Sequence, residues 1–241
     1  MNKEDLRLVR LASQSGLLPD LTRPIPPVPQ ALTAEAAGAI YGRVARFGFS
    51  SFQMVPGGAV LATAEGTSIL TLTGTGWQLQ ENLEKTAFRL VLDKQTVALE
   101  QYLAGFPGVR MVGHTVEVAG LWDGVTPNPT DYIASRFLKD QASALVTDMR
   151  GLTYNGGSIR LSLFKESEDP LPPGIQFGVE APRDTFDIRI EPFFGDKSKM
   201  WVQVNAIYPV PTDSVQVIER RTALARDILW DDLADRLSFG T

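Results

Sequence analysis

The chain has 241 residues, of which 44% are hydrophobic and 21% are charged, with a formal net charge of −5, one histidine and no cysteine. This length can bury one large core or two small ones, and the acidic balance argues against a general nucleic-acid-binding surface, which needs positive charge. The absence of cysteine excludes a disulfide framework, and a single histidine cannot supply the two imidazoles of a typical zinc or iron site.

The first thirty residues predict an N-terminal unit outside the compact body. Residues 1–15 are expected to form a short helix that Asn2 caps. Residues 17–30 contain five prolines, three of them at Pro24, Pro26 and Pro27. This density excludes a helix and favours an extended arm. Two interpretations stay open: a linker strapped across the fold, or an arm that docks on a neighbouring subunit.

The next part of the chain predicts an antiparallel meander flanked by helices. A helix is expected over 33–46. From residue 47 onward apolar side chains alternate, and glycine turns divide 47–80 into four short strands. Such short turns require antiparallel pairing, because parallel strands need long crossovers. A strand over 88–93, a helix over 94–104 and a strand over 109–118 are expected to follow.

A second block of strands is expected after a helix that starts near Asn128 and runs to about residue 149. Its strands are predicted over 158–164, 175–180, 186–193 and 200–208. Ile159, Leu161 and Leu163 form the inward set of the first strand. The acidic, proline-rich loop 166–174 is expected to lie in solvent.

The last segment predicts an amphipathic helix with Asp213 and Gln216 as its capping box. Its apolar stripe consists of Ile218, Ala225, Leu229, Leu233 and Leu237. The charged run Glu219 to Arg221 is expected to keep the opposite face of this helix in water.

Together these elements predict an α+β fold in which antiparallel β-meanders are covered by helices, with the N-terminal helix and Pro-rich arm over 1–30. Residues 31–241 are expected to form a single α+β domain. Strands precede a helix in both 31–150 and 151–241. The domain could therefore consist of two similar halves, a duplicated meander-plus-helix unit, although no residue-level repeat is visible.

His114 is the one imidazole available for chemistry. It shares a strand face with Val112, Val116 and Val118, so the simpler interpretation is a packed ring hydrogen-bonded to a backbone group. A role as general base requires a substrate cavity that reaches it.

A polar patch is predicted on the later strands. Asp187, Arg189 and Glu191 alternate along one strand, and Gln203 and Asn205 lie on the polar face of the next. The patch is either the wet side of a half-exposed sheet or a site for a polar ligand. Its two carboxylates could also serve the acid–base chemistry of a hydrolase or lyase.

Two aromatic residues near the end of the chain could contact a partner. Trp230 lies beside the apolar stripe of the last helix and either extends the core or anchors another protein. Phe239, close to the chain end, either packs against the rest of the fold or is exposed for binding to a partner.

These observations favour a non-enzymatic interaction or assembly protein of the cytoplasm, either self-associating or an accessory subunit of a larger complex. No run of eighteen apolar residues and no apolar leader segment occur, so we expect no membrane span and no secretion. We also expect no cofactor, no metal and no nucleic-acid partner. The alternatives are a small polar-ligand-binding module and a carboxylate-dependent hydrolase or lyase.

Overall fold

The computed structural model describes residues 2–19, 31–125, 128–137, 157–176, 178 and 180–238. The strands are β1 (Leu6–Pro19), β2 (Phe49–Val55), β3 (Gly58–Thr63), β4 (Ser68–Thr73), β5 (Gly76–Asn82), β6 (Val109–Trp122), β7 (Ile159–Glu166), β8 (Arg183–Pro192) and β9 (Met200–Tyr208). The α-helices are α1 (Ala34–Val44), α2 (Phe88–Ala104), α3 (Pro129–Phe137), α5 (Val215–Asp227) and α6 (Ala234–Ser238).

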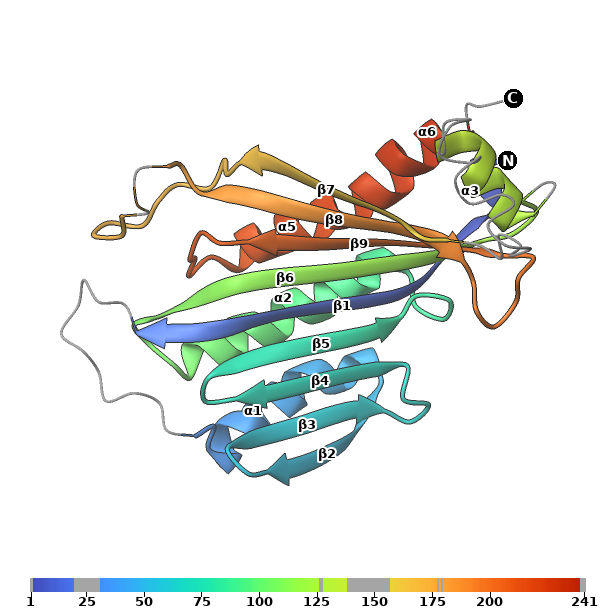
Figure 1. The fold of residues 1–241 in the computed structure, drawn as a ribbon. Helices are drawn as coiled ribbons and strands as arrows, with labels where there is room; N and C mark the ends of the chain where they lie inside the picture. The colour runs from blue at the N-terminus through green and yellow to red at the C-terminus, as the bar shows by residue number, and fades with distance from the viewer. Residues whose placement is uncertain are drawn as a thin grey trace.

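The described strands form one antiparallel sheet in the order β2-β3-β4-β5-β1-β6-β9-β8-β7, and α1, α2 and α5 lie against one of its faces (Figure 1). This arrangement confirms the predicted α+β fold with an antiparallel sheet covered by helices. The two strand-rich blocks flank the central β1–β6 pair and share one sheet. Their origin by duplication stays a prediction.

The predicted N-terminal helix is wrong, because residues 6–19 form the central strand β1. This strand pairs with β5 on one side and with β6 on the other. Its side chains Leu11, Ser13, Ser15 and Leu17 alternate into the core. A register shift beside Val9 changes the phase of this alternation, so the apolar residues around it also fit helical spacing. Residues 6–19 therefore belong to the sheet and not to a unit outside it.

The meander β2–β5 follows the prediction closely, and α1 begins after Thr33, whose hydroxyl accepts from the Ala36 N–H at 3.2 Å. The predicted strand over 88–93 is wrong, because these residues form the first turns of α2. The buried residues Val91, Ala98 and Tyr102 are seven and four positions apart, which is helical spacing, and they face the sheet.

In the second block, α3 begins where we expected, with the Asn128 side chain accepting from the Asp131 N–H at 2.9 Å. Residues 138–156, into which we extended this helix, lie outside the described residues. The predicted strand over 175–180 is wrong for its described residues 175, 176, 178 and 180, which lie in no strand. Gly174 ends a turn before them and Pro182 follows, and both residues disfavour a sheet interior.

The C-terminal helix starts one residue later than predicted. Ser214, not Asp213, is the N-cap, since its hydroxyl accepts from the Val217 N–H at 3.3 Å. After α5 the helix continues as a π-helical segment, Ile228–Leu233, and then as α6. The predicted apolar stripe is confirmed, because all five of its members are buried.

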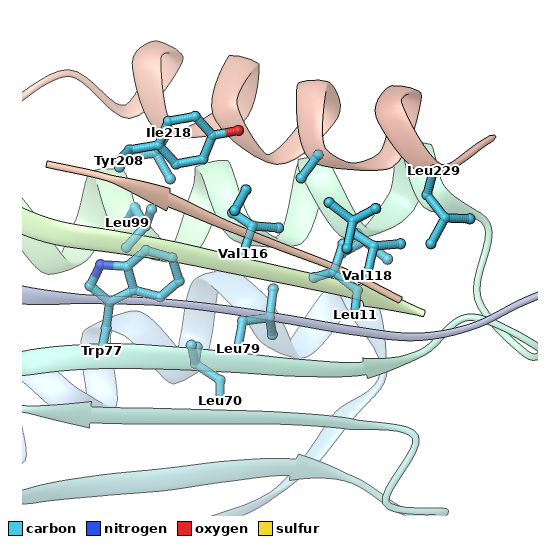
Figure 2. Packing of buried hydrophobic residues seen from close by; sticks show 14 of the residues in the cluster. Leu11, Leu70, Trp77, Leu79, Leu99, Val116, Val118, Tyr208, Ile218 and Leu229 are labelled. Atoms are coloured by element: carbon cyan, nitrogen blue, oxygen red, sulfur yellow. The ribbon is translucent and has the colours of Figure 1, made fainter. Parts of the chain in front are cut away.

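The core lies between the sheet and the helices. Figure 2 shows Leu11, Val116 and Val118 of the central strands beneath Ile218 and Leu229 of the C-terminal helical segment. No described helix covers the other face of the sheet (Figure 1). The outward residues of the described strands therefore form one broad face, which includes the predicted polar patch of β8 and β9.

Candidate functional site

The predicted polar patch lies on the uncovered face of the sheet. β8 and β9 pair in a register that places Asp187 opposite Asn205 and Arg189 opposite Gln203. Glu191 follows at the next outward position of β8. The structure therefore brings together all five residues that the sequence grouped, as side-chain alternation along paired strands requires.

The charged members of this patch bind one another or close neighbours. Arg189 Nε donates to Glu191 Oε2 at 2.8 Å, and the Ser162 hydroxyl donates to Asp187 Oδ1 at 2.7 Å. Pairs of this kind are ordinary on the wet side of an antiparallel sheet. Across the described residues, no cluster of three or more His, Asp or Glu side chains could hold a metal ion. A ligand-binding or catalytic role of the patch stays a prediction.

The residues predicted to meet a partner are only partly described. The ones outside the described residues are Pro24, Pro26, Pro27 and Phe239. Trp230 lies in the π-helical segment and packs against the core. The Lys3 Nζ is 6.0 Å and the Arg226 guanidinium carbon 5.9 Å from its ring centre. A half-buried ring between two cations agrees with the interpretation that Trp230 extends the core.

The edge strand β7 is a feature that the sequence did not reveal. Its residues Leu161, Leu163 and Phe164 are 41%, 51% and 65% exposed. We predicted Leu161 and Leu163 to be inward, and they do share the helix-covered face, opposite Ile188 and Phe186. The sheet ends at β7, however, and α5 packs mainly on β6 and β9. These leucines consequently remain half-exposed, although they lie on the inward face that the sequence predicted.

The other edge strand, β2, is better protected. A register shift between Phe49 and Ser51 interrupts its pairing with β3, and Pro56 follows its end. Tyr41 of α1 packs on Phe52 with ring centres 5.5 Å apart. Bulges, prolines and covering groups are devices by which edge strands avoid further pairing. β7 contains neither a bulge nor a proline, and its four central residues are uncharged.

His114 is fully buried, as predicted for a packed ring. It stacks on Tyr208 with ring centres 5.6 Å apart and lies 6.0 Å from Trp77. Its Nε2 hydrogen-bonds the Ser13 hydroxyl at 3.0 Å, a side chain in place of the backbone group we expected. Burial lowers the pKa of His114 well below its ordinary value of 6.5, so the ring is neutral. A ring without solvent contact cannot reach the proton of a substrate.

A hollow of about 390 Å³ lies between α5, β8 and the loop that joins β7 to β8. Its wall is dominated by charged side chains: Lys165, Glu168, Asp169, Asp184, Arg220, Arg221 and Asp227.

Two residues of this wall contradict the sequence-based expectation of a wet helix face and a solvent loop. The side chains of Arg221 and Asp169 are only 2% and 7% exposed. A sequence signal for Arg221 existed, because it stands three residues after Ile218 and four before Ala225, on the buried stripe.

Comparison with known proteins assigns the chain to no family. No protein-family model matches the chain, and no curated protein matches it. Across the described residues, we find no helix with the length and apolar character needed to cross a bilayer.

Proposed function

We propose that the protein is a non-enzymatic interaction protein of the cytoplasm, which assembles with a second copy of itself through β7. The proposal rests on the half-exposed apolar surface of β7, at an edge that pairs with no further strand among the described residues. Unshielded apolar edges are the places where sheets extend across chains. The cytoplasmic assignment is supported by the absence of cysteine, since disulfides mark many extracellular proteins.

The sequence of β7 suits pairing with itself. A two-fold axis perpendicular to the sheet would place two β7 strands antiparallel and join both sheets into one. If Leu163 lies on the axis, it faces its own symmetry mate, and Arg160 faces Glu166 at both ends of the pair. Unlike charges then meet twice and no like charges are opposed. Opposite-charge pairs across strands contribute about 0.2–1 kcal/mol each.

The same arrangement would cover the exposed leucines. Leu161 and Leu163 lie on the helix-covered face of the sheet. In the two-fold pair Leu163 would meet Leu163 of the second copy, while Leu161 would face the stem of Lys165 and lie diagonal to Leu163. Burying apolar surface contributes about 25 cal/mol per Å², which is the main gain available to offset the entropy cost of association.

Light scattering on the full chain over a wide concentration range tests this proposal. Leu163→Lys places two ammonium groups opposite each other in the pair, so we expect a monomer at concentrations where the unaltered chain is a dimer. Leu90→Lys is the matched control, because Leu90 is 40% exposed on α2, away from β7. Circular dichroism should show both variants folded. If the unaltered chain is monomeric throughout, or if Leu90→Lys dissociates as readily as Leu163→Lys, the proposal fails.

A charge exchange tests the register itself. Arg160→Glu opposes two carboxylates at each end of the pair and should weaken the dimer, whereas Arg160→Glu combined with Glu166→Arg should restore it. A double variant no stronger than Arg160→Glu contradicts this register. If β7 instead binds a different protein, the isolated chain is monomeric and none of these substitutions changes its mass.

A further inference from the structure

Arg221 is a buried cation near the middle of α5. Its Nη2 donates to the Val210 carbonyl at 2.7 Å, and its Nε donates to Asp169 Oδ2 at 2.7 Å. Its Nη1 is buried and has no acceptor among the described residues. Buried donors in proteins are almost always satisfied. This arginine therefore retains a donor that an added acceptor could use.

Two arginines hold a single carboxylate at this place. Asp169 Oδ2 accepts from Arg221, and its Oδ1 accepts from Arg220. The neighbouring Glu168 of the same loop is exposed and pairs with Lys165 at 3.0 Å. Guanidinium groups on both oxygens of one carboxylate make the arrangement by which proteins recognise carboxylate and phosphate groups.

Asp169 also lines two hollows. One is the charged hollow of about 390 Å³ beside Arg221. The other, of about 310 Å³, lies between residues 170–173 of the loop and the start of α5, and Asp169 lines it too. A movement of loop 167–176 away from α5 would join them and expose Arg221. Small-ligand sites typically occupy roughly 300–1,000 Å³.

Asp184 provides a second buried polar group in the charged hollow. It lies on β8, and its Oδ1 has no hydrogen-bond partner within the described part of the chain. Burial raises the pKa of Asp184 above its ordinary value of 3.8.

We propose that Arg220 and Arg221 form a site for the carboxylate or phosphate group of a small ligand, and that Asp169 occupies this site until loop 167–176 moves away. The site does not depend on pairing of β7 with a second copy, although Lys165 of β7 contributes to the wall of the hollow. Because the ligand competes with a tethered carboxylate, it binds only the molecules in which Asp169 is released. Its apparent affinity is therefore the intrinsic affinity of the open site multiplied by the fraction of such molecules.

Asp169→Asn is the deciding variant, since it removes the competing charge and keeps the size of the side chain. Inorganic phosphate and acetate are titrated separately into the full chain by calorimetry. We expect one of them to bind Asp169→Asn at least about tenfold more tightly than the unaltered chain, the equivalent of about 1.4 kcal/mol. The anion that gains affinity identifies the group as phosphate or carboxylate.

Glu168→Gln is the matched control, because it makes the same charge change one residue away, outside the pair of arginines. It should bind both anions as the unaltered chain does. If Asp169→Asn binds neither anion more tightly than Glu168→Gln, the proposal is overturned.

A second variant locates the bound anion. Arg220 is largely exposed, so Arg220→Gln should leave the fold intact, which circular dichroism can verify. Added to Asp169→Asn, it should abolish the gain in affinity. A double variant that keeps the tight binding would place the anion elsewhere and refute the site.

Discussion

The ion pair between Lys94 and Glu81 allows a quantitative test of how charge is tolerated in this core. Lys94 Nζ lies 3.1 Å from Glu81 Oε1 and 2.6 Å from the Ser68 hydroxyl, and both charged side chains are almost fully buried. Lys94→Met leaves the carboxylate buried without a counter-charge, and Glu81→Leu does the same to the ammonium. Each loss should cost about 3–5 kcal/mol. For a domain of this size that lowers Tm by roughly 6–20 °C.

Replacing the whole group should have the opposite effect. Burial raises the pKa of Glu81 above its ordinary value of 4.5, in spite of the adjacent ammonium and the Ser68 hydroxyl. Desolvation therefore outweighs the attraction within the pair. The triple variant Ser68→Ala, Glu81→Leu and Lys94→Met is expected to be as stable as the unaltered chain or up to about 4 kcal/mol more stable.

Urea denaturation of the unaltered chain, the two single variants and the triple variant measures these differences. The raised pKa also sets the direction in which stability changes with pH, because the folded protein holds the Glu81 proton more tightly than the unfolded chain does. Its contribution to the free energy of unfolding thus falls as the pH rises from 4.5 through the folded pKa, and it should vanish in the triple variant. A triple variant that loses as much as the two single variants together would refute this reasoning.

Three further predictions concern other parts of the sheet and its helices. Because the folded protein excludes the proton of His114, the free energy of unfolding should fall by up to about 1.4 kcal/mol per pH unit below 6.5, and urea titrations of His114→Gln should lack this component. Gly58→Ala would press a methyl group onto a backbone carbonyl of β4, so it should lower the free energy of unfolding by about 1–3 kcal/mol or more. Gly38 lies on the exposed side of α1 with nothing within 4 Å of an added methyl group, so Gly38→Ala should raise that free energy by about 0.5–1 kcal/mol. Thermal melts of both variants measure these changes. The Tyr102 hydroxyl donates to backbone carbonyls of β4 and β5 at 2.6 and 2.9 Å. Tyr102→Phe should therefore lower the free energy of unfolding by about 1–3 kcal/mol. An unchanged melting temperature would show that these hydrogen bonds do not stabilise the fold.

Local signals were sufficient for much of the fold. The alternation and glycine turns of 47–80 predict β2–β5, since each of these strands pairs with its neighbour in sequence. Local signals were insufficient for β1, because its pairing with the distant β6 sets Leu6 opposite Trp122. A short apolar run fits a helix and a strand equally well, and here distant strands decide between them.

The surface features likewise divide into those that local sequence patterns predict and those that depend on distant parts of the chain. Alternation along β8 and β9 is enough to group Asp187 with Asn205, because their spacing is local to two adjacent strands. It cannot show that Leu163 lies on the last strand of the sheet, because inner and edge strands share the same apolar alternation. Nor does the acidity of loop 167–176 reveal that Asp169 folds back onto Arg221.

The position of β1 has a consequence for how the chain reaches its native state. This strand precedes the other described strands in the sequence, yet it is the fifth of the nine described strands across the sheet, and its partner β6 ends only at Trp122. During synthesis the apolar segment of β1 therefore lacks its partner β6 until the chain has been extended as far as Trp122. Distant pairing of this kind slows folding and exposes intermediates to aggregation. Truncation of the first nineteen residues would remove β1, the strand that connects the two blocks of strands through β5 and β6. We therefore expect such shortened chains to be insoluble.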